Sequence, residues 1–131
     1  MNFKKTADTL ELGAHTLQRE YYIDPNILDK EYKTIFQKKW ICVGRSNDIK
    51  EPGQFITHEI GNESIIIVRD KDQGIKAHYN VCRHRGTRIC NDAKGTFPKS
   101  IQCGYHGWTY ALDGSLVGAP HMNEVENFDK K

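Results

Sequence analysis

The sequence has no long apolar run and no strong excess of either charge. Its longest aliphatic stretch, residues 65–68, is far too short to cross a membrane. The N-terminus starts with basic residues but lacks the apolar segment that a secretory signal needs. The net charge is only +2, from 19 lysines and arginines against 17 acidic residues, which favours neither nucleic acid nor an anionic membrane as a partner. We therefore expect a cytoplasmic protein that binds no membrane and no nucleic acid.

Cysteine is also scarce, with four residues in a chain of 131. A domain of this size buries enough apolar surface to fold without disulfides. In the cytosol a group of cysteines indicates a metal site or catalysis more often than a disulfide. Two of the four lie in motifs with histidine. Of the other two, we expect Cys42 to be a buried free thiol and Cys90 to be a loop thiol.

The remaining pattern predicts one helix followed by many short strands. Residues 24–40, DPNILDKEYKTIFQKKW, predict an amphipathic helix that Asp24 caps and Pro25 begins. Residues 1–20 are expected to form a loosely held arm. Apolar runs at 55–60 and 64–69 flank a Gly61–Asn62 turn, and further strands are expected at 75–81, 100–103 and 108–112. Asp113–Gly114 predicts a two-residue hairpin, and the whole pattern is typical of a mainly β sandwich or small barrel.

Two pairs of cysteine and histidine lie between these strands. The first is Cys82-x-His84 in VCRHRGTRIC, and the second, after 18 intervening residues, is Cys103-x-x-His106 in IQCGYHGWTYALDG. Both pairs sit in loops that contain glycine, which lets the backbone approach an inorganic centre closely. Two loops at one end of a sheet could bring two thiolates and two imidazoles to one point. A zinc site is the alternative, although zinc fingers usually pair Cys with Cys and His with His.

The motifs CRHRG and CGYHGW resemble the signature of Rieske [2Fe-2S] domains. With the segments around them, over about residues 20–122, they resemble the N-terminal part of the large (alpha) subunit of Rieske non-haem iron oxygenases, which include aromatic-ring-hydroxylating dioxygenases and choline- and betaine-type monooxygenases. The resemblance implies a Rieske-type antiparallel β-sandwich, with an N-terminal helix and two cluster-binding loops at one tip. It implies Cys82 and Cys103 as ligands of the inner iron, and His84 and His106 as ligands of the outer iron.

Two positions, one in each loop, distinguish the respiratory branch of the Rieske proteins from the oxygenase branch. Respiratory Rieske proteins resemble a pattern with an extra cysteine in each loop, and this chain has Thr87 and Tyr105 there. The oxygenase branch usually has proline after the second cysteine, where this chain has Gly104.

With two imidazoles in place of two thiolates the oxidised centre is formally neutral. The reduction potential of such centres is therefore roughly −150 to +300 mV, against about −400 mV for plant-type clusters.

The resemblance also implies domains and partners. We expect an arm and helix at 1–39, a Rieske domain at 40–121, and a tail at 122–131 where a catalytic domain would follow. The domain would pass electrons from a ferredoxin or reductase to a mononuclear Fe(II) that activates O2, in a full-length protein for which the resemblance implies a homotrimer. No histidine follows His121, so we expect no mononuclear-iron site and no catalytic residue in this chain. A free-standing Rieske-type ferredoxin and a zinc-stabilised interaction module are the alternatives, and the helix favours the oxygenase.

Other residues near the motifs have structural or functional interpretations. Arg83, Arg85 and Arg88 form a basic run that is either solvated and salt-bridged or able to bind an acidic electron donor. Trp108 and Tyr105 are expected to pack around the cluster rather than to relay electrons. The remaining histidines are expected on strand faces or at the surface: His15, His58, His78 and His121.

Overall fold

The computed structural model describes residues 10–129. The chain divides into two compact units, Met1–Trp40 and Ile41–Lys131. The first half of the predicted arm, residues 1–9, and the end of the predicted tail, residues 130–131, lie outside the described residues. No helix in the described part of the chain is long and apolar enough to span a bilayer.

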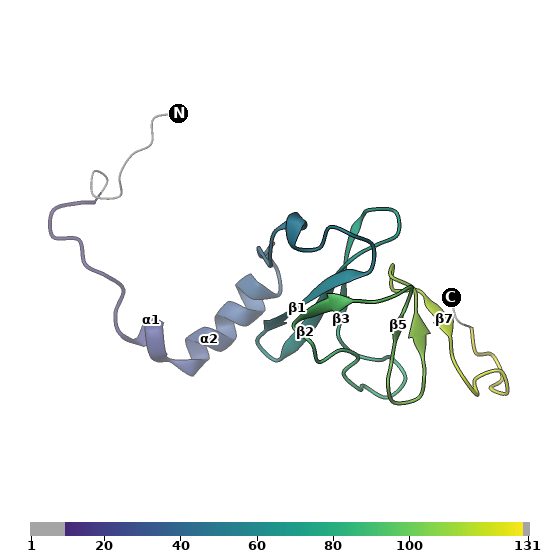
Figure 1. Cartoon of the computed structure of the whole chain (residues 1–131). Helices are drawn as coiled ribbons and strands as arrows, with labels where there is room; N and C mark the ends of the chain where they lie inside the picture. The colour runs from purple at the N-terminus through teal and green to yellow at the C-terminus, as the bar shows by residue number, and fades with distance from the viewer. Residues whose placement is uncertain (1–9, 130–131) are drawn as a thin grey trace. The chain divides into compact units, whose positions relative to one another are not determined.

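The first unit contains a short helix, α1 (Glu20–Ile23), then α2 (Pro25–Glu31) and one π-helical turn, η2 (Tyr32–Phe36) (Figure 1). The predicted start is confirmed, because the Asp24 carboxylate accepts a hydrogen bond from the Asn26 backbone N–H at 2.8 Å. The predicted end at Trp40 is wrong. The Thr34 hydroxyl donates to the carbonyl of Lys30 at 2.7 Å, a bond that loosens a helix, and regular structure ends at Phe36.

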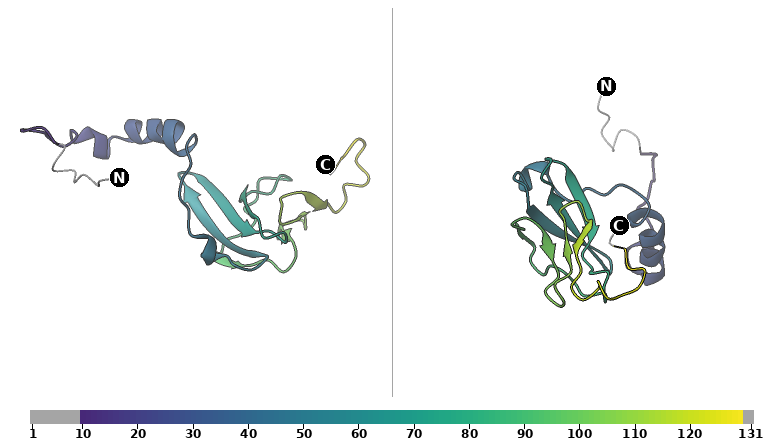
Figure 2. Two further views of the ribbon diagram at one scale, coloured as in Figure 1. Left: turned by 90° about the horizontal axis from the view of Figure 1, so that it is seen from above. Right: turned by 90° about the vertical axis from the view of Figure 1, so that its right-hand side faces the viewer.

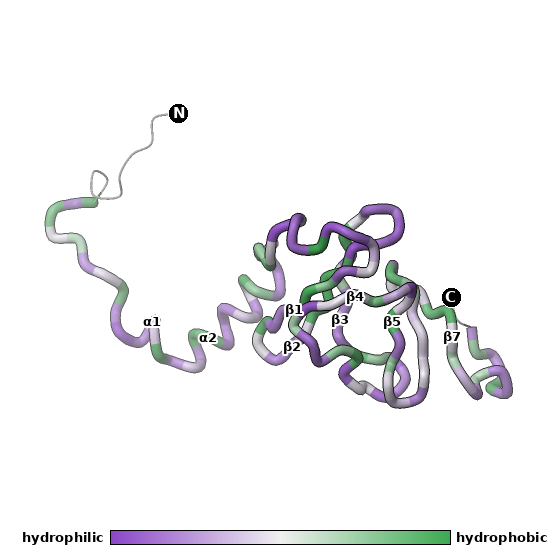
Figure 3. Tube along the Cα trace, viewed as in Figure 1, coloured by the Kyte–Doolittle hydropathy of each residue, from purple (hydrophilic) through white to green (hydrophobic). Residues whose placement is uncertain are grey.

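The apolar stripe of this helix is not buried within the first unit. Apolar residues recur among polar ones along the segment (Figure 3), as the predicted amphipathic helix requires. None of residues 10–40 is buried, and the side chains of Leu28 and Ile35 are each 47% exposed. Most helical stability in proteins comes from packing of the apolar face, and within the first unit these side chains lack such packing.

The second unit contains two antiparallel sheets. A 3-10 turn, η3 (Ser46–Asp48), precedes the larger sheet, whose order is β3-β2-β1-β4 with strands β1 (Gln54–Ile60), β2 (Glu63–Arg69), β3 (Ile75–Tyr79) and β4 (Lys94–Thr96). The smaller sheet, in the order β5-β6-β7, contains β5 (Ile101–Gln102), β6 (Thr109–Tyr110) and β7 (Leu116–Gly118). Figure 2 shows strands β1 to β3 of the larger sheet in blue to teal and the smaller sheet in green to yellow-green. The predicted mainly β, antiparallel fold is confirmed.

The two predicted hairpins differ in how closely they follow the sequence. In the first, Ile60 pairs with Glu63, so Gly61 and Asn62 form the expected two-residue turn. In the second, the backbone N–H of Ala111 donates to the carbonyl of Ser115 at 2.8 Å. The turn therefore has three residues rather than two, a common alternative that ends in glycine.

The core of the second unit joins both sheets and includes three cysteines. Its buried members are Phe55, Ile66, Val68, Cys82, Cys90, Ile101, Cys103, Trp108, Tyr110, Leu112 and Ala119. Ile66 and Val68 of β2 are fully buried. The loops that carry the Cys/His pairs thus begin inside the core and extend outward from it, so the packing of the sheets fixes where each loop starts.

Candidate metal centre

The two loops with the Cys/His pairs have the same internal hydrogen bonds. We call residues 82–87 the first loop and residues 103–108 the second loop. In the first, the Cys82 N–H donates to the carbonyl of Thr87 and the Gly86 N–H to that of Cys82, at 2.8 and 2.9 Å. In the second, Cys103 donates to Trp108 and Gly107 to Cys103, at 2.8 and 3.1 Å. Both loops therefore fold into the same turn.

A glycine closes each turn at the same place. Gly86 has a φ of +72° and Gly107 a φ of +71°, a left-handed conformation that glycine adopts without steric cost. Each glycine follows its cysteine by four residues. The histidine positions differ, since His84 is the third residue of its loop and His106 is the fourth of its own. The two loops therefore share a backbone plan and differ in the position of the histidine.

The loops bring their cysteines together inside the core. Cys82 and Cys103 are each only 2% exposed and belong to the same core cluster, and the Cys103 thiol is among the groups that lower the pKa of Cys82. Both are free thiols. Two adjacent buried sulfurs are therefore available as ligands, and neither is committed to a disulfide.

The histidines meet at the outer side of the same site. The rings of His84 and His106 are 4.8 Å apart, centroid to centroid, in an edge-on arrangement. His84 is partly buried and His106 is exposed. The His106 ring lies 3.8 Å from that of Tyr105. Two nitrogen donors thus lie near the surface and two sulfur donors lie beneath it.

Tyr110 adds a functional contact that the sequence analysis missed, because it placed this residue only within a strand. Its hydroxyl oxygen is 3.3 Å from the Cys82 sulfur and accepts the Arg83 backbone N–H at 3.1 Å. Tyr110 is 7% exposed, as is Trp108. Side chains two residues apart on a strand share a face. That alternation is the one sequence signal from which the position of Tyr110 beside the site could have been predicted.

These contacts set the protonation of the donors. Burial acts to raise the pKa of the Cys82 thiol, but hydrogen bonds from the Tyr110 hydroxyl and the His84 backbone N–H outweigh it and lower that pKa. Burial, followed by the hydrogen bond to Cys82, raises the pKa of Tyr110 to about 12. Tyr110 therefore keeps its proton at neutral pH and can donate it to a thiolate, the form of cysteine that binds metals.

His84 is held in the form that binds a metal. Desolvation, followed by the positive charges at His106 and Arg85, lowers the pKa of His84 below its ordinary value of 6.5. Its imidazole is thus neutral at neutral pH, as a metal ligand must be.

The three arginines of the basic run have different roles. Arg88 forms an ion pair with Glu59 and its guanidinium also donates to the Ser64 hydroxyl at 2.7 Å, so the structural interpretation is correct for this residue. Arg83 and Arg85 are exposed, and in residues 10–129 no hydrogen bond or ion pair of their guanidinium groups is found. These two cations flank His84 in the sequence and leave a positive surface beside it.

The other cysteines and histidines lie outside the two loops. The prediction for Cys42 was wrong: this residue is exposed, because Ile41 and Val43 on either side turn inward and alternate residues of an extended chain face opposite ways. Cys90 is in a loop, as predicted, and is also buried. The histidine predictions are confirmed: His58 and His78 lie on strands, and His15 and His121 are exposed.

The donor set fits a cluster of two irons. Within residues 10–129, no group of three or more His, Cys, Asp or Glu side chains is placed to hold a single metal ion. A [2Fe-2S] cluster needs fewer protein ligands at each metal ion, because each iron takes two protein ligands and shares the two sulfides. Two buried thiols and two adjacent imidazoles supply these four ligands.

Comparison with known proteins supports this chemistry. The sequence pattern of the family described as "Rieske [2Fe-2S] domain" matches residues 39–129. The chain is 44% identical, over 126 residues, to the glycine betaine monooxygenase oxygenase subunit of Chromohalobacter salexigens, covering 95% of this chain and 28% of that protein. It is 40% identical over 118 residues to the carnitine monooxygenase oxygenase subunit of Acinetobacter baumannii, covering 90% of this chain and 32% of that protein.

A solved structure agrees in fold. A quaternary ammonium Rieske monooxygenase, described in connection with carnitine oxidation and inter-subunit electron transfer, superposes with a TM-score of 0.80 at 40% identity. The superposition covers 85% of this chain and 30% of that one. The chain thus spans about a third of the length of the relatives it matches.

Proposed function

The chain belongs to the Rieske [2Fe-2S] domain family, and we propose that it is the electron-transfer domain of an oxygenase. Cys82, Cys103, His84 and His106 would hold the cluster. When bound, such a cluster takes up one electron and gives it back. The observation that carries the proposal is the pairing of two buried thiols beneath two outward imidazoles on loops of the same fold.

The surroundings suit the four proposed ligands. The lowered pKa of Cys82 favours its thiolate, and the lowered pKa of His84 favours its neutral ring. Cysteine sulfurs inside the core would hold the inner iron, and histidines at the surface would hold the outer one. Trp108 stacks on His84 and keeps water from that side of the ring. The apolar shell around a metal site controls solvent access and therefore its potential.

Arg83 and Arg85 suggest the kind of electron donor. They are exposed cations on the same loop as His84, whereas the third arginine, Arg88, is engaged by Glu59 and Ser64. A positive surface beside the outer iron would attract an acidic ferredoxin or reductase and speed its association. The contact would be strongest at low ionic strength, because salt screens exposed charges.

The electron acceptor would be a mononuclear iron in an oxygenase catalytic domain, which in a homotrimer could belong to a neighbouring subunit. The relatives named above are oxygenase subunits about three times as long as this chain. Their alignments reach 90–95% of this chain, beyond the residues 39–129 that the family pattern matches. This extension favours the oxygenase over a free-standing ferredoxin. The names of those relatives make a quaternary ammonium compound the candidate substrate of the complete enzyme.

Iron and sulfide analysis tests the proposal directly. Protein purified without oxygen should contain about two irons and two acid-labile sulfides per chain, and should give an EPR signal on reduction. Cys82→Ser and Cys103→Ser should each lose the cluster, whereas the matched control Cys42→Ser, at an exposed thiol, should keep it. A colourless protein that holds zinc and no sulfide would contradict the proposed function.

A further inference from the structure

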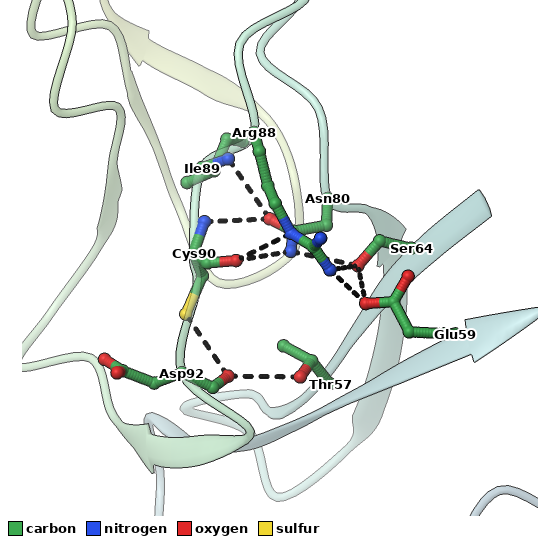
Figure 4. A network of polar contacts seen from close by, with 8 residues as sticks. All are labelled: Thr57, Glu59, Ser64, Asn80, Arg88, Ile89, Cys90 and Asp92. Carbon is green, nitrogen blue, oxygen red and sulfur yellow. Dashed lines mark hydrogen bonds and ion pairs between the residues drawn. The ribbon is translucent and has the colours of Figure 1, made fainter. Parts of the chain in front are cut away.

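We propose that Asn80 is the positioning residue of the first loop, because its side chain fastens the base of that loop where the strand pairing ends. The inference rests on the proposed function, since the first loop carries Cys82 and His84. It adds a residue outside the four proposed ligands. The evidence is a buried network of hydrogen bonds between Asn80 and the returning chain at Ile89 and Cys90 (Figure 4).

The two loops differ in the backbone pairing at their bases. The second loop stands on a regular ladder, in which Ile101 pairs with Tyr110 and Gln102 with Thr109. The first loop stands on an isolated bridge between Val81 and Arg88. Strand β3 has already ended at Tyr79. Because the turns themselves are alike, the first loop needs another connection at its base to be held as firmly as the second.

Asn80 supplies that connection with its side chain. Its Oδ1 accepts the backbone N–H of Cys90 at 2.8 Å and that of Ile89 at 3.2 Å. Its Nδ2 donates to the carbonyl of Cys90 at 2.6 Å. These are the backbone groups that a partner strand would satisfy in a ladder. The carboxamide therefore continues the pairing by one step beyond the Val81–Arg88 bridge.

The same residue is anchored to the larger sheet. The Asn80 backbone N–H donates to the carbonyl of Ser64 at 2.8 Å, and Nδ2 also donates to the Ser64 hydroxyl at 3.1 Å. Arg88 adds a second connection, from its Nε to the carbonyl of Cys90 at 3.3 Å and from its guanidinium to Ser64 at 2.7 Å. The base of the first loop is thus tied to β2 through both Asn80 and Arg88.

The chemistry requires an amide at this position. Asn80 is 3% exposed, and a buried polar group must find partners. Its oxygen receives two N–H groups while its nitrogen donates to two oxygens, and an amide alone among side chains of this length both donates and accepts in this way. Aspartate would keep the acceptor and lose the donor. Alanine would leave the backbone N–H groups of Ile89 and Cys90 without their partner.

Substitution of Asn80 in the cluster-loaded full chain tests the inference. We expect Asn80→Ala to lose the cluster to a chelator at least fivefold faster than wild type, and to shift the EPR g values and the midpoint potential. Asn80→Asp should lose the cluster at a rate between those of wild type and Asn80→Ala. Asn91→Ala is the matched control, because Asn91 is an exposed asparagine close by, and it should stay within twofold of wild type. A variant Asn80→Ala that keeps native circular dichroism but binds no cluster supports the same conclusion.

Other outcomes would contradict the inference. If Asn80→Ala changes only the melting temperature, and matches Asn91→Ala in g values, midpoint and cluster loss, Asn80 has a merely structural role and the inference is wrong. If Asn80→Ala does not fold, hydrogen exchange in the wild type decides. The amides of Ile89 and Cys90 should exchange at least 100-fold more slowly than that of Asn91, and equal rates would overturn the inference. A wild type without sulfide would instead contradict the proposed function.

Discussion

The indole ring of Trp108 lies flat on the imidazole of His84, with centroids 4.9 Å apart and an interplanar angle of 8°. The two residues come from different loops, so the stack holds one loop against the other. Trp108 also contacts the ring of Phe128 at 5.8 Å. Within residues 10–129 its buried indole N–H has no hydrogen-bond partner.

Truncation of Trp108 should therefore release His84. We expect Trp108→Ala to lower the free energy of unfolding by about 3–5 kcal/mol, the usual cost of removing a large buried aromatic side chain. Trp108→Phe keeps an aromatic face for His84 and should cost less than half as much. Denaturant unfolding of the loaded protein measures both. Equal losses in the two variants would show that stacking on His84 contributes nothing.

Removal of the Tyr110 hydroxyl should lower the reduction potential. The hydroxyl lies 3.3 Å from the Cys82 sulfur, and a donor to that sulfur stabilises the more electron-rich reduced state. If the two oxidation states differ by about 1 kcal/mol in this hydrogen bond, Tyr110→Phe lowers the midpoint by about 40 mV. Redox titration measures the shift. Tyr105→Phe is the control, because Tyr105 is 60% exposed, and a similar shift there would exclude a specific effect of Tyr110.

Replacement of His84 by cysteine should lower the potential further. A neutral imidazole would give way to an anionic thiolate, and clusters with four cysteines lie at about −400 mV, compared with roughly −150 to +300 mV for Rieske centres. The variant His84→Cys, if it retains iron and sulfide, should therefore move by at least 100 mV toward negative values. His121→Cys, at an exposed histidine, is the control. An unchanged potential in His84→Cys would mean that His84 is not a ligand.

Loss of positive charge on the first loop should slow reduction by an acidic donor. Arg83→Ala and Arg85→Ala together should reduce the association rate by about 3–10-fold at low salt, since steering by exposed charges acts mainly on association. Stopped-flow reduction at several ionic strengths measures the effect. Lys71→Ala removes an exposed lysine between β2 and β3 and should change the rate little. A double variant with the wild-type salt dependence would place the docking surface elsewhere.

Gly104, which occupies the usual proline position of the family, should tolerate a side chain. A Cβ built there meets nothing within 4 Å, and its φ lies outside the left-handed range. Gly104→Ala should therefore raise the free energy of unfolding by about 0.4–1 kcal/mol by restricting the unfolded chain. Gly107→Ala, in the same loop at a φ of +71°, should lower it. Denaturant titration of both variants checks the contrast, and destabilisation by Gly104→Ala would contradict it.

Local patterns account for the parts of the fold that the sequence predicts well. The β1–β2 hairpin follows from two apolar runs and the Gly61–Asn62 turn between them, all within about sixteen residues. The Cys/His spacing identifies the proposed ligands for a similar reason, since each pair lies within one loop. The cap of α2 by Asp24 is likewise a contact between residues two positions apart. Short-range contacts leave a signature that can be recognised in sequence.

Contacts between distant residues explain what the sequence does not predict. Arg88 and Glu59 are 29 residues apart, and Asn80 and Ser64 are 16 apart. Nothing in the neighbouring residues distinguishes Arg88 from Arg83 or Arg85, although only Arg88 is held by the sheet. The exposure of Cys42 and the early end of the helix also depend on packing, which the periodicity of apolar residues does not specify.

The shared plan of the two loops has a consequence for loop exchange. In a chimaera with residues 103–108 in place of residues 82–87, the turn and the sulfur would be preserved, because both loops close with the same hydrogen bonds. The nitrogen donor would move one position along the chain, from the third residue to the fourth. The two loops are therefore not interchangeable. Their backbones close in the same way, and the one-residue difference in histidine position makes the site asymmetric.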